Sequence, residues 1–103
     1  MNHIKYISLD KVQIGPLVFP IKMVKNLRGH RHECGNVCYE IDRCIEIDPD
    51  SDDDIKSITI LHEIIHAIDY VYLQQKLEDK TIDGLATGLW QVLKQWGIDF
   101  DWE

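Results

Sequence analysis

The chain has 103 residues, of which 45% are hydrophobic, and a formal net charge of -7 at pH 7. This length suits one domain with a single core, and the composition is that of a globular protein. The negative charge argues against nucleic acid or anionic lipid as a partner, and no apolar run approaches the roughly 20 residues that cross a membrane. The N-terminal residues show no export signal and the three cysteines fit free thiols, so a cytoplasmic location is expected.

The first half of the chain is typical of strands. β-Branched residues mixed with glycine and proline predict one or two short strands over residues 11–26, and a polar loop over 27–35 follows. The next segment predicts a hairpin with strands Val37–Tyr39 and Cys44–Ile47. The second of these strands is expected to be an exposed edge.

The second half predicts two helices, and the fold class is therefore α+β. The first helix is expected over Ser51–Leu73, where Ser51 and Asp54 resemble a capping box. The second is expected to start near Glu78–Lys80 and to end at Gly97. Its apolar residues keep the spacing of one buried stripe, with Gly84 and Gly88 leaving room for a close neighbour: Ile82, Leu85, Ala86, Leu89, Val92, Leu93 and Trp96. The alternating tail from Ile98 predicts a last strand or a docking tag.

The stretch LHEIIHAID, residues 61–69, places two histidines around a glutamate. On a helix, His62 and His66 lie one above the other and can bind one zinc ion. Glu63 lies about a quarter-turn round, near enough to take a proton from a zinc-bound water. This is the HExxH pattern of zinc peptidases.

The alternative is a pair of core histidines that binds no metal. Against it, Glu63 and Asp69 are the only charged residues from Ser57 to Leu73. The polar residues of this segment form one stripe on the helix: Thr59, His62, Glu63, His66, Asp69 and Tyr70. Without Lys or Arg the stripe is expected to face the protein interior on a helix that is nearly all buried, where a metal would satisfy its polar groups.

A zinc site of this kind needs a third protein ligand. Glu78, Asp79 and Asp83 lie at or inside the start of the second helix, which a short turn would bring back against the first. Asp83, at the edge of the apolar face of that helix, is the preferred candidate, and Glu78 is the runner-up. The alternative for Asp83 is a solvated acid favoured by the helix dipole. Asp69, one turn beyond His66, is expected to orient an imidazole. Tyr70 could donate a hydrogen bond to a bound carbonyl, and the alternative is a structural tyrosine whose hydroxyl only needs a partner.

A family resemblance rests on LHEIIHAIDY followed by IDGLATGLWQVLKQ, after the hairpin GNVCYEIDRCIEID. Together these segments resemble small phage- and prophage-encoded zincin-like metallopeptidases, which are similar to the minigluzincins and, distantly, to the ImmA/IrrE group. The resemblance covers about Gly35 to Gln95 and implies a minimal zincin domain working in a bacterial host cell. It implies His62 and His66 as zinc ligands, Glu63 as the catalytic base and Asp83 as the acidic ligand, where gluzincins have glutamate.

The expected function is zinc-dependent hydrolysis of a peptide bond in a peptide or protein substrate, with an extended peptide held along the Cys44–Ile47 strand. One alternative is a binding module in which zinc only fixes the fold and the protein docks on a partner. A weaker alternative is a helical interaction protein that holds no metal.

The loop and hairpin carry further metal-binding residue types: His30, His32, Cys34, Cys38 and Cys44. Their spacing matches no standard zinc finger, so a loop with incidental thiols is the simpler interpretation. Cys38 and Cys44 are expected to approach each other across the hairpin turn but to stay reduced in a cytoplasm. His30, His32 or Tyr39 could also stabilise an oxyanion.

Overall fold

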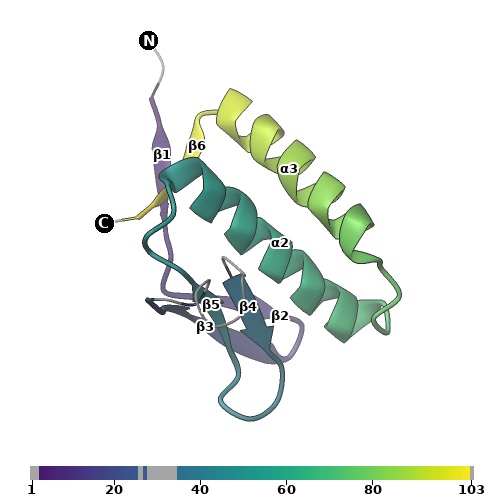
Figure 1. Cartoon of the computed structure of the whole chain (residues 1–103). Helices are drawn as coiled ribbons and strands as arrows, with labels where there is room; N and C mark the ends of the chain where they lie inside the picture. Colours follow the sequence, from purple (N-terminus) through teal and green to yellow (C-terminus); the bar gives the residue numbers. More distant parts are fainter. Residues whose placement is uncertain (1–2, 26, 28–34, 103) are drawn as a thin grey trace.

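The computed structural model describes residues 3–25, 27 and 35–102. Its elements, in chain order, are β1 (Lys5–Ser8), β2 (Lys11–Ile14), β3 (Leu17–Met23), β4 (Gly35–Cys38), β5 (Cys44–Ile47), α2 (Asp53–Tyr72), α3 (Asp79–Gln95) and β6 (Ile98–Asp101). The α+β class is therefore confirmed, with α2 lying between α3 and the sheet that contains β4 and β5 (Figure 1). Among the described residues, no helix combines the length and apolar character that crossing a bilayer requires.

The strands form two sheets. The larger sheet has the order β2-β3-β5-β4, and the smaller one pairs β1 with β6 in parallel, close to the two ends of the chain (Figure 1). The prediction that the Cys44–Ile47 strand is an exposed edge is wrong. β3 pairs in parallel with one side of β5 and β4 pairs antiparallel with the other, so β5 is central. In the described part of this sheet, β4 is the last strand.

The core forms where the larger sheet meets α2. Ile45 and Ile47 of β5 are completely buried, as are Phe19 of β3 and Ile60 of α2. β2 and β3 are the predicted pair of short strands, and they are joined by a turn in which Gly15 has a φ of +58°. A left-handed backbone of this kind favours glycine. The predicted strands therefore exist, and their alternate residues supply the core.

The helix α2 matches the predicted range with shorter ends. Its N-cap is Asp52, whose Oδ1 accepts a hydrogen bond from the Ile55 N–H at 2.9 Å, so the capping box predicted from Ser51 is wrong. The expectation that this helix is nearly all buried is also wrong, because Ile68 is 37% exposed and Tyr72 is 62% exposed. The sheet covers one face of α2 and α3 covers a second, which leaves part of its C-terminal half open.

The helix α3 runs back along α2 (Figure 1). It is followed by Gly97 with a φ of +75°, as the sequence predicts. Its expected single buried stripe is wrong. The buried residues are Ile82, Ala86 and Trp90, whereas Leu85, Leu89, Val92 and Trp96 are 37 to 72% exposed. A Cβ atom on Gly84 or Gly88 would meet nothing within 4 Å, so the expected close neighbour is absent from the described part of the chain.

Candidate metal centre

The two histidines of α2 lie side by side, one helical turn apart. The Nε2 atoms of His62 and His66 are 3.1 Å apart, and the ring centroids are 4.7 Å apart. Two ligand atoms about 2.0–2.1 Å from a tetrahedral zinc ion lie roughly 3.3 Å from each other. The pair of imidazoles therefore fits one zinc ion with little movement of either side chain.

Glu63 lies beside the histidines on the face of α2 that meets β4. One ligand atom from each of His62, Glu63 and His66 can be chosen so that all lie within 4.8 Å of one another. The glutamate is only 7% exposed, and a Cβ atom added to Gly35 would lie 3.2 Å from its Oε2. The close approach of the β4 backbone thus holds this carboxylate next to the histidines, as the quarter-turn offset predicts.

Two aspartates from α3 contact the histidines. Oδ1 of Asp83 is 2.8 Å from Nδ1 of His62, and Oδ1 of Asp79 is 3.2 Å from Nε2 of His66. The contact with Nδ1 favours the His62 tautomer in which Nε2 keeps a lone pair, the form that a metal ion binds. Asp83 therefore lies beside His62, as the sequence predicts, but it contacts Nδ1, the nitrogen that orients the ring, and not the Nε2 atom that faces His66. Asp79 is the carboxylate on the side where the two Nε2 atoms meet. Glu78, the runner-up, is the exposed N-cap of α3 and does not line the pocket.

Asp79 was among the acids expected near the first helix, but it was not chosen as a ligand. It lies one turn before Asp83 on α3, so the two carboxylates share a face of that helix. The helical spacing of Asp79 and Asp83 was the available signal. Which of the acids near the start of the helix face α2 depends on how α3 is rotated about its axis, and its apolar residues do not fix that rotation.

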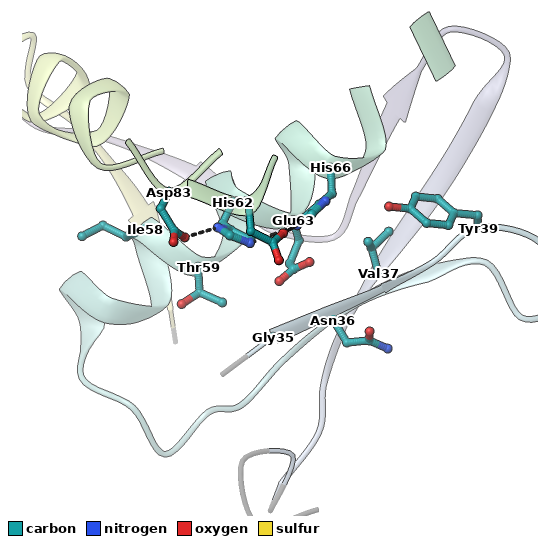
Figure 2. A pocket seen from close by; sticks show the side chains of 11 residues that line it. Gly35, Asn36, Val37, Tyr39, Ile58, Thr59, His62, Glu63, His66 and Asp83 are labelled. Carbon is teal, nitrogen blue, oxygen red and sulfur yellow. Dashed lines mark hydrogen bonds and ion pairs between the residues drawn. The ribbon is translucent and has the colours of Figure 1, made fainter. Parts of the chain in front are cut away.

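The two histidines, Glu63 and the two aspartates line one pocket of about 510 Å³. β4 and the residue after it form one wall, and α2 and α3 form the other, as Figure 2 shows. The complete lining is Gly35, Asn36, Val37, Tyr39, Ile58, Thr59, His62, Glu63, His66, Asp79 and Asp83. The pocket thus has the histidines on one side and the last described strand of the sheet on the other.

Burial sets the charge of two groups in the pocket. It lowers the pKa of His66, and the nearby His62 lowers that pKa further. His66 is therefore neutral at pH 7, which is the form that binds metal. Burial also raises the pKa of Tyr39, with the charges of Glu63 and Asp69 acting in the same direction. Tyr39 consequently keeps its proton at neutral pH and can donate a hydrogen bond.

Asp69 and Tyr70 lie further from the pocket than the sequence suggests. The Asp69 carboxylate accepts hydrogen bonds from the backbone N–H groups of Lys76 and Leu77, at 2.9 and 3.1 Å. It therefore supports the connection between α2 and α3. The Tyr70 ring stacks on Tyr39 at 4.2 Å, and its hydroxyl donates to Glu40 at 3.4 Å. Tyr70 thus packs against a pocket residue and does not point its hydroxyl at the histidines.

The remaining candidates divide between two places. His30, His32 and Cys34 lie outside the described residues, so the proposed second metal site has no structural account. Cys38 and Cys44 lie on the β4–β5 hairpin and are free cysteines that do not line the pocket.

In comparisons with known proteins, no protein family, curated protein or solved structure matches this chain.

Proposed function

We propose that the protein is a zinc-dependent peptidase. The observation that carries the proposal is the group of His62, Glu63 and His66, whose ligand atoms lie together at one side of a pocket. Two histidines four residues apart with an adjacent glutamate provide both a metal site and a base. This assignment agrees with the resemblance of the sequence to small zincin-like metallopeptidases.

The donor set fits zinc because it combines two imidazoles with carboxylates. His62 and His66 would hold the ion through Nε2, with Asp79 as the carboxylate beside Nε2 of His66. Asp83 would orient His62 through Nδ1. Zinc, when bound, lowers the pKa of a water molecule toward neutrality and polarises the carbonyl to be attacked. Glu63 accepts the proton of the attacking water and later passes it to the leaving amine. Its buried position beside the histidines suits this role.

β4 is the element best placed to hold a peptide. It is the last strand of the described part of its sheet and lines the pocket with Gly35, Asn36 and Val37. An extended peptide could pair by strand addition with the side of β4 that pairs with no other described strand, which would bring the scissile bond past Glu63. Tyr39 follows β4, with its hydroxyl on the His66 side of its ring (Figure 2). Because it remains protonated, it can donate to the substrate carbonyl.

The decisive experiment compares Glu63→Gln with Glu78→Gln, an exposed control that makes the same chemical change outside the pocket. Wild type and both variants are loaded with zinc, assayed for metal content and incubated with a peptide library analysed by mass spectrometry. We expect about one zinc per chain in all three proteins. Cleavage is expected to fall by at least 100-fold in Glu63→Gln alone, the effect of removing a general base.

Equal cleavage by wild type and Glu63→Gln would contradict the catalytic role of the glutamate. If every protein binds zinc but none cleaves any peptide, the centre fixes the fold and the binding-module alternative replaces the peptidase. Wild-type protein that binds no zinc would overturn the metal site itself.

A further inference from the structure

Cys38 and Cys44 form a pair outside the candidate metal centre. Cys38 ends β4 and Cys44 begins β5, and the two are directly opposite each other in the antiparallel register. Both are free thiols, and neither lines the pocket. The pair is separated by the short connection over residues 39–43, so its geometry is fixed by the hairpin itself.

The register satisfies the distance that a disulfide requires. Opposite residues of antiparallel strands have Cα atoms about 4.5 to 5.5 Å apart and side chains on the same face. Disulfides span Cα separations of about 4.4 to 6.8 Å. The two side chains are close enough for Cys38 to contribute to the raised pKa of Cys44. Little backbone movement is therefore needed to bring the sulfur atoms to bonding distance.

The two thiols differ in access and reactivity. Cys44 is 3% exposed, and burial raises its pKa to about 11, with Cys38 adding to the effect. Cys38 is only half-buried, and its Sγ accepts a hydrogen bond from Nδ2 of Asn36 at 3.5 Å. Thiol–disulfide exchange requires that the attacking sulfur reach the external disulfide, so the more exposed cysteine reacts first. Cys38 is thus the thiol that an external disulfide meets first.

We propose that Cys38 and Cys44 are a dithiol site that closes into a disulfide by exchange with a low-molecular-weight disulfide such as oxidised glutathione. The Cys38 thiolate attacks one glutathione sulfur, forms a mixed disulfide and releases one glutathione thiolate. Cys44 then loses its proton to solvent and attacks Cys38 Sγ, which releases the second glutathione. Two electrons pass from the protein thiols to the glutathione disulfide, and the protein loses two hydrogens.

The bond would tie the end of β4 to β5. β4 also supplies Gly35 and Val37 to the pocket, and Tyr39 directly follows Cys38. Closing the hairpin at this point therefore constrains one wall of the pocket from its outer end. The dithiol site itself rests on the strand register and does not depend on whether the centre binds zinc.

The test uses the full chain with Cys34→Ser, which leaves only Cys38 and Cys44 as thiols. The folded protein is incubated with oxidised glutathione, quenched in acid, alkylated and digested with trypsin without reduction. Trypsin cleaves after Arg43 and separates the two cysteines, so a disulfide between them is seen as one cross-linked pair of peptides. We expect this pair as the main product. With Cys44→Ser added, a glutathione adduct on Cys38 is expected to persist.

Two results would overturn the proposal. The first is a stable glutathione adduct as the main product of the Cys34→Ser protein, because it would show that Cys44 does not reach Cys38. The second is that both thiols of the folded protein remain alkylatable while the same protein in guanidinium reacts with the reagent, because the fold would then hold the thiols apart. Both results can be read without the Cys44→Ser variant, so they stand even if that variant does not fold.

Discussion

At the scale of single residues, the candidate metal centre depends on contacts between side chains from two helices. Asp83 is 2.8 Å from His62, and its side chain is 69% exposed, whereas Asp79 is 3.2 Å from His66 and 82% exposed. Asp79 is also the first residue of α3, where a helix frays. Asp83 is therefore the better held of the two carboxylates and the one on which zinc affinity should depend more.

We accordingly expect Asp83→Ala to weaken zinc binding by about 10- to 100-fold, the usual effect of losing a residue that binds a metal or orients its ligand. Asp79→Ala should weaken it less, because its longer contact and greater exposure make it easier for water to replace. Competition with a chromophoric chelator measures both affinities. A larger loss in Asp79→Ala would show that the carboxylate beside Nε2 of His66 contributes more to zinc affinity than the one that orients His62.

At the scale of elements, the site depends on how closely β4 approaches α2. A Cβ atom on Gly35 would lie 2.5 Å from Thr59 Cγ2, 3.2 Å from Glu63 Oε2 and 3.2 Å from the Glu46 carbonyl oxygen. One of these neighbours belongs to the backbone of β5, so it cannot move aside alone. Position 35 thus requires glycine for space, and the strand could not lie this near α2 with a side chain there.

The tightness of this contact can be tested by comparing Gly35→Ala with the control Gly88→Ala. Gly88 lies in a helix at a position where a Cβ atom would meet nothing within 4 Å. Gly35→Ala should lower the free energy of unfolding by about 1–3 kcal/mol because it overpacks the contact between β4 and α2. Gly88→Ala should raise it by about 0.5–1 kcal/mol because alanine has the higher helix propensity. Urea denaturation measures both. Unchanged stability in Gly35→Ala would show that β4 can move away from α2.

At the scale of the whole molecule, a bound zinc ion would join the two helices. α2 supplies the histidines and α3 the aspartates, while the sheet holds α2 from the other side. The ion would therefore add to the packing that keeps α3 against α2. Binding to the folded state alone stabilises a protein in proportion to the logarithm of the ligand concentration over its Kd.

Zinc at 100 times its Kd should add about 2.7 kcal/mol to the free energy of unfolding, or roughly 10 to 20 °C in melting temperature for a chain of this size. His62→Ala should abolish the shift, and His3→Ala should keep it, since His3 is exposed and lies outside the pocket. Thermal denaturation followed by circular dichroism, with and without zinc, tests this. A shift that survives in His62→Ala would place the stabilising ion elsewhere.

The sequence by itself determined the parts of the structure that depend on local spacing. His62, Glu63 and His66 fall on one side of α2 because helical geometry fixes the positions of residues three and four apart. The hairpin, both helices and the turn residue Gly97 were predicted for the same reason, since each depends on neighbours in the chain. The α+β class follows from these elements.

Tertiary structure alone decided what lies against each element. β5 became central because β3, far away in sequence, pairs with it, and no residue of β5 encodes that partner. The strand β1 was missed because its residues are all exposed and show no alternating burial, so its pairing with β6 leaves no pattern. Asp79 joined the site because the rotation of α3 against α2 is set by packing across both helices, and a pattern of residues along one helix cannot specify it.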